Sequence, residues 1–232
     1  MPEPVVAAYT IGQTPRPDLL RSLTARFPAI RLEVLGALDG LERDEIPPCP
    51  PRGYPLETHL ADGRRVVVDA WFVQPRLQQQ INERHPHVSA HLLMCAGAFP
   101  GLLAPPPPVG SPTPATPFIH PFEVAVSAFK RHGFRTLDVM VPFADQAPAA
   151  MDKWAGRDFA CRAHVLAEKP RHRSLAEWIS GLVRGTRAQA LVIDYVGLPT
   201  QALDDVTAAL DLPVFDLGRL ALDALEDTLD AL

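Results

Sequence analysis

The segment HLLMCAGAFPG, residues 91–101, decides the fold class. An apolar run ends at Cys95, and small residues and a Phe-Pro corner follow it. This order is typical of a buried parallel strand that gives way to a turn. Ligands of open α/β sheets bind beyond the carboxyl ends of the strands, where Cys95 would lie. If a helix follows, its free N–H groups would favour a thiolate and a bound anion. The competing interpretation is a cysteine that only fills the core.

A second stretch repeats this pattern. LVIDYVGLP, residues 191–199, again runs from an apolar strand through a polar stop to a glycine and a proline. In this comparison Cys95 aligns with Tyr195, and Gly97 aligns with Gly197. We therefore expect two similar lobes whose strand ends face each other across a cleft.

Strands and helices alternate along the rest of the chain, which predicts parallel sheets covered by helices. We expect two doubly wound, Rossmann-like α/β lobes, residues 1–112 with 211–232, and residues 113–210. The proline-rich segment 100–117 is the predicted crossover, since prolines exclude a central strand or a helix interior. Asp62-Gly63 predicts a hairpin turn, and Pro75 is expected in the first turn of a helix over residues 74–84. The predicted strands are 4–11, 30–35, the run ending at Cys95, 136–141, 159–165, with Cys161 in the core, 188–193 and 213–215; the further helices are 122–132, one through Trp154, 175–184, 201–210 and 217–229.

The first strand ends in the loop GQTPRPD, residues 12–18. Thr14 can cap the helix that follows, and Pro15 or Pro17 suits the first turn of that helix. The side chains of Gln13, Thr14 and Arg16 offer amide, hydroxyl and guanidinium donors, which suit a carboxylate or phosphate. An ordinary capped turn explains the same residues equally well. The loop PFADQAP, residues 142–148, carries a glutamine and prolines in a similar arrangement.

The composition of the chain limits the classes of partner that it can bind. The 232 residues are 47% hydrophobic and carry a net charge of −5, which argues against nucleic acid as the main partner. The dense basic cluster at residues 169–173 is either a solvated loop or an anion-contacting one. The N-terminus lacks the features of a secretory signal, and no apolar run reaches membrane-spanning length. Three widely spaced cysteines make no disulfide framework, so we expect a cytoplasmic protein with reduced thiols. A homodimer is compatible with the sequence.

Several familiar catalytic motifs are absent. The chain has no G-x-S-x-G, no phosphate loop of the G-x-x-x-x-G-K-[ST] type and no G-x-G-x-x-G after the first strand. The eight histidines are scattered, so no metal site is expected from their spacing. His91 would lie roughly 13 Å from Cys95 along an extended strand, too far for a hydrogen bond. A histidine that activates Cys95 would have to be a remote one, such as His120 or His172.

Six motifs together resemble one protein family. They are TIGQTPRPD from Thr10, LGALDGL from Leu35, LETHLADGRRV at residues 56–66, MCAGAFP from Met94, VPFADQ with the pair Lys153-Trp154, and IDYVGL from Ile193. This set is similar to the AroM family, a branch of the aspartate/glutamate racemase superfamily. The resemblance implies two pseudo-symmetric lobes with a small-acid site between them. In the superfamily each lobe can offer a cysteine, and members racemise amino acids, isomerise maleate or decarboxylate arylmalonates.

Two residues depart from the pattern of the superfamily. Ala96 stands where a threonine is usual, and Tyr195 stands where the second cysteine is usual. We expect Cys95 to act as thiolate base or nucleophile and Tyr195 as a hydrogen-bond or proton donor. The expected substrate-binding residues are Thr10, Gly12, Gln13, Thr14, Arg16, Ala96, Gly97, Pro142, Gln146, Asp194 and Gly197. The predicted function is cofactor-independent isomerase, racemase or lyase chemistry on a small carboxylic acid. The alternative is a non-catalytic sensor of small carboxylates.

Overall fold

The computed structural model describes residues 3–85, 87–106 and 115–231, and the chain divides into two compact units. The first lobe consists of residues 1–121 and 221–232, and the second of residues 122–220. Each lobe contains a four-stranded sheet in which every pairing is parallel. The α/β class predicted from the alternating pattern is therefore confirmed.

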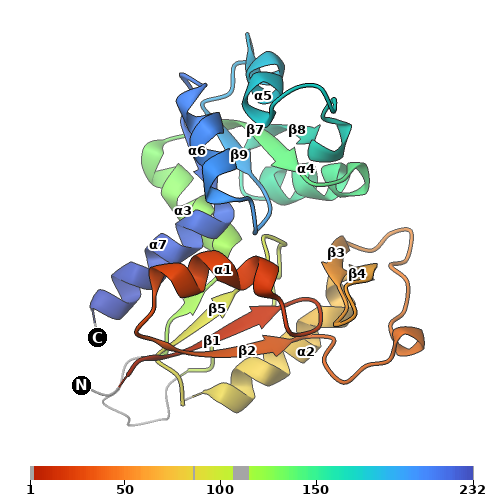
Figure 1. Ribbon diagram of the computed structural model, residues 1–232, viewed down its shortest axis with the longest axis vertical. Helices are drawn as coiled ribbons and strands as arrows, with labels where there is room; N and C mark the ends of the chain where they lie inside the picture. The colour runs from red at the N-terminus through yellow and green to blue at the C-terminus, as the bar shows by residue number, and fades with distance from the viewer. Residues whose placement is uncertain (1–2, 86, 107–114, 232) are drawn as a thin grey trace. The chain divides into compact units, whose positions relative to one another are not determined.

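The first lobe is built on a sheet with the order β2-β1-β5-β6. Its strands are β1 (Val5–Thr10), β2 (Arg31–Gly36), β5 (Ala90–Leu93) and β6 (Phe118–Ile119). Helices α1 (Pro17–Arg26) and α2 (Ala70–Arg84) lie on opposite faces of this sheet (Figure 1). The proline-rich segment does not lead straight into the second lobe, because Phe118 first pairs with His91 and adds β6 to the sheet. Part of that segment, residues 107–114, lies outside the described residues.

A two-stranded antiparallel hairpin, β3 (Pro55–His59) and β4 (Arg65–Asp69), precedes α2. Its turn is the predicted one: Gly63 has a φ of 82°, and Leu60 N–H donates to the Arg64 carbonyl at 2.9 Å. The predicted start of the next helix is wrong. Asp69 caps α2 by accepting the Trp71 N–H at 3.3 Å, so the helix begins at Ala70 and Pro75 lies inside it.

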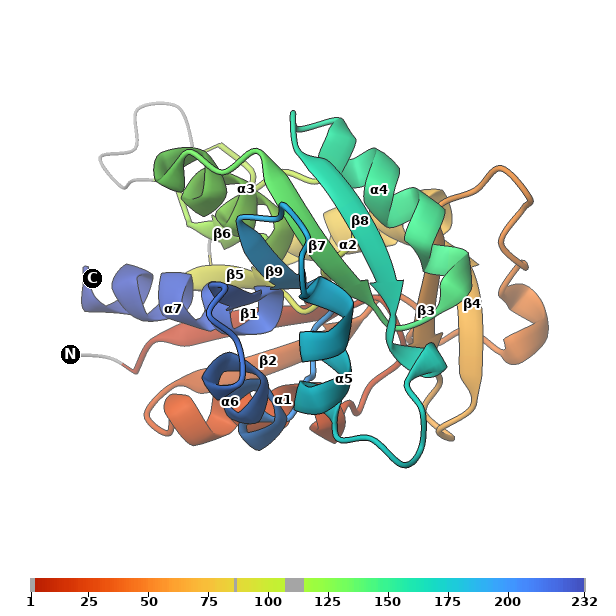
Figure 2. The same ribbon diagram turned by 90° about the horizontal axis from the view of Figure 1, so that it is seen from above.

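The second lobe has the strand order β10-β9-β7-β8. Its strands are β7 (Thr136–Val141), β8 (Ala160–Val165), β9 (Ala190–Ile193) and β10 (Val214–Asp216). The helices are α3 (Pro121–His132), α4 (Ala147–Ala155), α5 (Leu175–Val183), α6 (Thr200–Ala208) and α7 (Leu217–Asp230), and short 3-10 turns occur at Arg43–Glu45, Ala144–Gln146 and Leu166–Glu168. In Figure 2, α5 and α6 lie on one face of this sheet and α4 lies on the other.

Different side chains fill the two faces of the second sheet. On one face Trp154 is fully buried, and its ring centroid lies 4.9 Å from that of Phe122. On the other face, aliphatic residues of α5 and α6 such as Ile179 and Leu203 pack on the strands. Cys161, expected in the core, is half-buried on the edge strand β8, and burial raises the pKa of its thiol to about 11.

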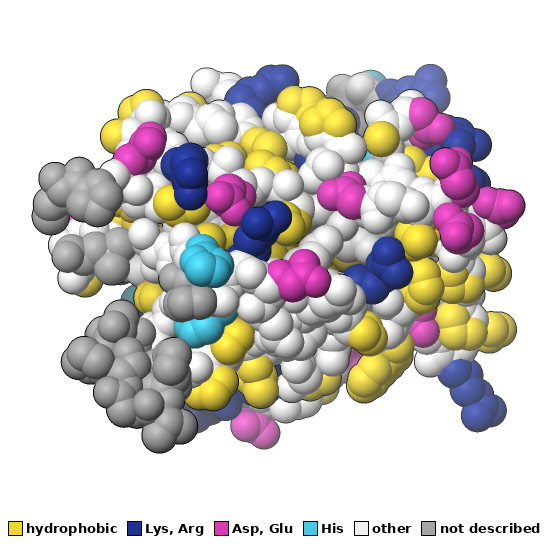
Figure 3. All heavy atoms as spheres, turned by 90° about the horizontal axis from the view of Figure 1, so that it is seen from below, with side chains coloured by type: hydrophobic (Ala, Val, Ile, Leu, Met, Phe, Trp, Pro, Cys, Tyr) yellow, Lys and Arg dark blue, Asp and Glu magenta, His cyan; other side chains and the backbone are white. Residues whose placement is uncertain are grey.

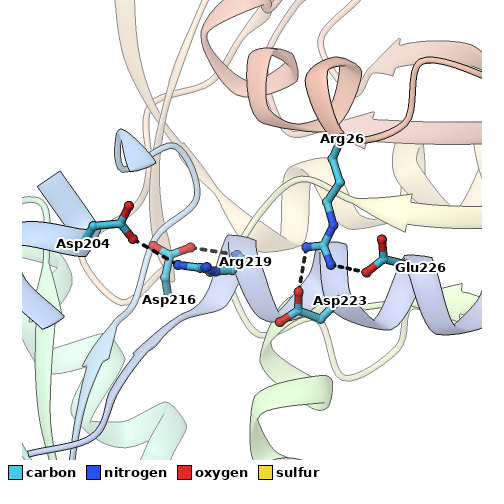
Figure 4. Close-up of polar contacts among 6 residues, drawn as sticks. All are labelled: Arg26, Asp204, Asp216, Arg219, Asp223 and Glu226. Atoms are coloured by element: carbon cyan, nitrogen blue, oxygen red, sulfur yellow. Dashed lines mark hydrogen bonds and ion pairs between the residues drawn. The ribbon is translucent and has the colours of Figure 1, made fainter. Parts of the chain in front are cut away.

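The last helix, α7, belongs to the first lobe from Ala221 onward. There Arg26 of α1 forms ion pairs with Asp223, at 2.6 Å, and with Glu226 (Figure 4). Among the residues that the structure describes, none of the helices has the length and hydropathy needed to cross a bilayer.

Candidate functional site

Cys95 lies just beyond the end of β5, at the carboxyl edge of the first sheet. Its side chain is buried, and the Gly97 N–H donates to its Sγ at 3.3 Å. Residues 96–106 contain no helix, so the Cys95 thiol does not have beside it the helix N-terminus that the sequence analysis considered. The backbone N–H of Gly97 is instead the donor placed to stabilise negative charge on the sulfur.

The turn after Cys95 is held closely by its neighbours. A Cβ atom at Gly97 would lie 2.9 Å from Cδ2 of Leu56 and 3.1 Å from Cε2 of Phe99. The Ala98 N–H points to the hydroxyl of Tyr54 at 3.4 Å. Because this packing leaves no room for a side chain, glycine at position 97 keeps its N–H directed at the sulfur.

Arg16 is buried in the loop after β1. Its guanidinium donates to both carboxylate oxygens of Asp18, at 2.9 and 2.7 Å, and to the hydroxyls of Thr10 and Thr58, at 3.3 and 3.1 Å. The Arg16 guanidinium in turn lowers the pKa of Asp18. Gly12 is required beside this cluster, since a Cβ there would lie 2.3 Å from Oγ1 of Thr58. The structure therefore brings Thr10, Gly12 and Arg16 together, and their binding of a substrate stays a prediction.

Gln13 and Thr14 also lie in this loop, but their side-chain donors have acceptors within the protein. Nε2 of Gln13 donates to the carbonyls of Leu38 and Leu41 at 3.0 and 2.7 Å, and Oε1 accepts the Ala61 N–H at 2.9 Å. Thr14 donates its N–H and its hydroxyl to the carboxylate of Asp39, at 2.7 and 3.1 Å. These bonds give both residues an architectural role, and ligand binding by them stays a prediction.

His91 and His120, two of the histidines considered as partners of Cys95, lie at different positions along the strands of the first sheet. His91 is fully buried, with Nδ1 2.8 Å from the Tyr9 hydroxyl, and burial lowers its pKa to about 4. His120 directly follows β6, and the register of Leu92 with Ile119 puts it at the carboxyl edge beyond which Cys95 lies. Its ring centroid is 6.0 Å from that of Phe99. Of the two remote histidines named in the sequence analysis, His120 and His172, the first therefore lies at the edge that bears Cys95.

In the second lobe, Asp194 follows β9 directly but turns into the interior. Its carboxylate accepts from Nζ of Lys153 at 2.6 Å and from Nε1 of Trp154 at 3.0 Å. The side chains of Asp194 and Lys153 are only 1% and 3% exposed. Burial raises the pKa of Asp194, and the Lys153 ammonium opposes that shift. Asp194 therefore anchors the strand end to α4, and its carboxylate is already paired.

Tyr195 and Gly197 form the turn after Asp194. Tyr195 is half-buried against the aliphatic cluster of α5 and α6. Burial, together with the nearby charge of Asp216, raises the pKa of Tyr195 above its ordinary value, so its hydroxyl keeps its proton. Gly197 has a φ of 109°, a backbone conformation that favours glycine. Pro142 and Gln146 follow the neighbouring strand β7, and the buried Oε1 of Gln146 has no hydrogen-bond partner in the described part of the chain.

Asp216 is a polar residue of this edge that the sequence analysis missed. It ends β10, in register with Ile193 of β9. Oδ1 accepts the Arg219 N–H at 2.7 Å and so caps α7, as Figure 4 shows. Oδ2 is buried without a hydrogen-bond partner among the described residues, and burial raises the pKa of this carboxyl to about 6. An aspartate between a short strand and an amphipathic helix is the signal that marks this cap in the sequence.

The match to a known family covers almost the whole chain. The family described as "AroM protein" matches residues 6–227. The chain belongs to the AroM family. Among curated proteins, no match to the chain was found.

Solved structures show the fold of this AroM protein in other chains. Unliganded arylmalonate decarboxylase is 12% identical, with a TM-score of 0.57, and the alignment covers 97% of this chain and 92% of that one. Glutamate racemase from Francisella tularensis subsp. tularensis SCHU S4, in complex with D-glutamate, is 13% identical with a TM-score of 0.54 and covers 99% and 82%. A cysteine-to-serine mutant of Nocardia farcinica maleate cis-trans isomerase is 15% identical with a TM-score of 0.55 and covers 98% and 93%.

Two further features of the AroM chain concern its surface charge and its metal-binding side chains. On the face drawn in Figure 3, basic and acidic side chains are interspersed. The residues described contain no group of three or more His, Cys, Asp or Glu side chains placed to hold a metal ion. In the basic cluster of residues 169–173, Lys169 Nζ donates to the carbonyls of Pro170 and Arg173 at 3.2 and 2.8 Å.

Proposed function

We propose that this AroM protein is a cofactor-independent enzyme that moves a proton at a carbon beside a carboxylate. The reaction class is isomerase, racemase or decarboxylase-like lyase. The observation that carries the proposal is the placement of Cys95: a buried thiol at the carboxyl end of a parallel strand, with the Gly97 N–H directed at its sulfur. Proteins of this fold supply the chemical class. Their names include a racemase of glutamate, a decarboxylase of arylmalonates and an isomerase of maleate, and the last carries a covalent succinylcysteine intermediate.

Cys95 acts as the thiolate that removes a proton or attacks the ligand. Negative charge then develops on the ligand carboxylate as an enediolate, and backbone N–H groups near Ala96 and Gly197 are the proposed stabilising donors. Tyr195 serves as a hydrogen-bond or proton donor and not as a base, because its raised pKa keeps its hydroxyl protonated. Thiol and phenol are therefore chemically unequal, and the proposed reaction is stereospecific and not a balanced racemisation.

A non-catalytic carboxylate sensor is the second candidate. Two observations favour it: Tyr195 occupies the position of a second thiol, and the side-chain donors of Gln13 and Thr14 are bonded within the protein. The two candidates differ in the behaviour of Cys95. An enzyme requires rapid alkylation of this thiol at neutral pH with protection by carboxylates, whereas a sensor requires only ligand-induced thermal stabilisation.

The test measures exchange of the carbon-bound proton in deuterated water. Phenylmalonate, each enantiomer of glutamate, and maleate are incubated with the wild type and with Cys95→Ser, and products are read by NMR and mass spectrometry. We expect turnover of at least one acid, from one enantiomer where the acid is chiral, and its loss in Cys95→Ser at an unchanged melting temperature. Full turnover in Cys95→Ser, or equal exchange from both enantiomers, would overturn the assignment.

A further inference from the structure

A surface pocket of about 520 Å³ lies beside α5, the helix drawn next to α6 in Figure 2. Positions 177, 180 and 184 are three and four residues apart, so their side chains share one face of the helix. All the lining residues belong to the second lobe, and the pocket is therefore a feature of that lobe alone. The lining consists of Arg173, Ala176, Glu177, Ser180, Arg184 and Ala209.

Two arginines from opposite ends of α5 line this pocket. Arg173 precedes the helix, and Arg184 follows its last residue. The guanidinium of Arg173 lies back along the helix, because its Nη1 is 4.0 Å from where a Cβ of Gly181 would be. Gly181 and Arg184 are three residues apart and are therefore neighbours on the helix surface. Both arginines thus reach the last turn of α5.

The positive charge of these arginines is not neutralised within the described part of the chain. Both side chains are exposed, and neither guanidinium has an ion pair or a hydrogen bond to a described residue. The carboxylate in the lining, that of Glu177, accepts the N–H and the hydroxyl of Ser174 at 3.1 and 2.9 Å. These hydrogen bonds, and after them the charge of Arg173, lower the pKa of Glu177. The pocket therefore carries two positive charges against one negative charge.

The other donors near the pocket are used within the protein. Lys169 Nζ donates to the carbonyls of Pro170 and Arg173, and the Arg173 N–H donates to the Pro170 carbonyl at 3.2 Å. These bonds tie the basic loop together and fix the backbone from which the Arg173 side chain extends. The hydroxyl of Ser180 donates to the Ala209 carbonyl at 3.2 Å. The side-chain donors left in the lining are the two guanidiniums, which suit an anion.

We propose that this pocket binds a phosphate monoester, whose phosphoryl group lies between the guanidiniums of Arg173 and Arg184. A guanidinium offers paired N–H donors to phosphate oxygens, and a monoester carries close to two negative charges at neutral pH. The volume of the pocket lies in the range of small-molecule sites and leaves room for the organic part of the ester. Binding here makes and breaks no covalent bond and involves no residue of the first lobe. The inference is therefore independent of the reaction proposed for Cys95.

The test is a titration with glycerol phosphate at low salt, measured by calorimetry and by ¹H–¹⁵N NMR. We expect saturable binding, with the amide shifts concentrated between residues 169 and 184. Arg173→Gln and Arg184→Gln should each weaken binding at least about tenfold, because each removes a charged hydrogen-bond donor. The matched control is Arg171→Gln, which removes a positive charge from the same loop outside the pocket lining and should leave the affinity unchanged. All three arginines are exposed, so the variants should keep the melting temperature of the wild type.

Four outcomes would overturn the site or its ligand. Absence of saturable binding, or equal affinity in the wild type, Arg173→Gln and Arg184→Gln, would exclude a phosphate in this pocket. An equal loss in Arg171→Gln would show only a diffuse attraction to the basic loop. Succinate bound as tightly as glycerol phosphate would overturn the choice of phosphate over carboxylate. Cys95→Ser should bind glycerol phosphate as the wild type does, whatever its turnover, so a failure of this site and a failure of the proposed function are distinguishable.

Discussion

The carboxyl edges of the two sheets differ in what their buried charges do. In the first lobe, Cys95 meets a backbone N–H, and the one buried guanidinium described there, that of Arg16, is neutralised by Asp18. In the second lobe, Lys153 and Asp194 neutralise each other, while Asp216 keeps an unpaired oxygen. The edge of the first sheet therefore carries a buried thiol, and the edge of the second carries a buried carboxyl whose pKa is raised. The backbone determines where a group lies, and the burial and pairing of its side chain determine its pKa.

The largest effect is expected from the buried ion pair of the second lobe. Lys153→Met leaves the Asp194 carboxylate buried without its cation, which should lower the free energy of unfolding by about 3–5 kcal/mol. Urea denaturation at pH 7 measures this loss. The double variant Lys153→Met/Asp194→Leu removes both charges and should recover most of the stability. A single variant as stable as the wild type would show that the pair is not buried in solution.

Asp216→Asn should be more stable than the wild type at pH 8. The folded carboxyl has a pKa of about 6, against 3.8 for an ordinary aspartate, so the wild type loses stability as the pH rises from about 4 through 6. The difference in pKa corresponds to about 3 kcal/mol above pH 6. Asparagine has no such charge, and its advantage should vanish below pH 4. Denaturant titrations of both proteins at pH 4 and pH 8 measure it, and an advantage equal at both values would refute the cause.

The first lobe should respond to pH in the opposite sense. His91 has a pKa of about 4 when folded, against an ordinary 6.5, so its contribution is present above pH 6.5 and is lost as the pH falls through 4. Hydrogen exchange, corrected for intrinsic rates, compares amides of β1 and β5 with those of β9 and β10. Acidification from pH 7 to pH 5 should lower protection in the first lobe relative to the second. A uniform change across both lobes would contradict this contrast.

The thiols of Cys95 and Cys161 should differ in reactivity by a factor on the order of 100. Burial raises the pKa of Cys161 to about 11, so at pH 7 it is almost wholly protonated. Cys95 has the Gly97 N–H directed at its sulfur and is expected to react at least as fast as an ordinary thiol. Iodoacetamide labelling followed by peptide mass spectrometry measures both rates in one sample. Equal rates for Cys95 and Cys161 would show that the surroundings of Cys95 do not make it the more reactive thiol.

The smallest effect is expected at the exposed ion pairs of the first lobe. Arg26 contacts Asp223 and Glu226 on the surface, and exposed pairs contribute about 0.2–1 kcal/mol. Arg26→Ala should therefore lower the free energy of unfolding by less than about 1 kcal/mol, with the difference shrinking in 1 M salt. A loss comparable to that of Lys153→Met would show that exposure does not explain the difference between the lobes.

The sequence was informative where one local pattern decides the structure. Apolar runs located the strands that end near Cys95 and Asp194, and Asp62-Gly63 located the hairpin. It failed where two patterns compete. Pro75 suggested that the helix begins at Gln74, but Asp69 caps it and the helix begins at Ala70. It failed again where distant segments decide. The carbonyls that occupy Gln13 come from another loop, and only the fold brings them near.

The same limit applies to Asp216 and to Asp194. Both are aspartates at strand ends, and their neighbouring residues do not show whether either carboxylate is paired with a cation. The structure pairs one with the ammonium of Lys153 and leaves an oxygen of the other unpaired. The pairing and the pKa of such a carboxyl therefore depend on tertiary neighbours that a single sequence does not show.

The bonds of Gln13 have a consequence for how such proteins are found. One amide side chain holds two carbonyls and one N–H from separate segments, and a glutamate there would bring its charge against the carbonyls of Leu38 and Leu41. The motif Gly-Gln-Thr-Pro-Arg-Pro is thus a signature of how the loop is built. We therefore expect a genome search with that motif to select chains by the architecture of this loop and not by their chemistry. Sorting them by reaction requires reading positions 95 and 195.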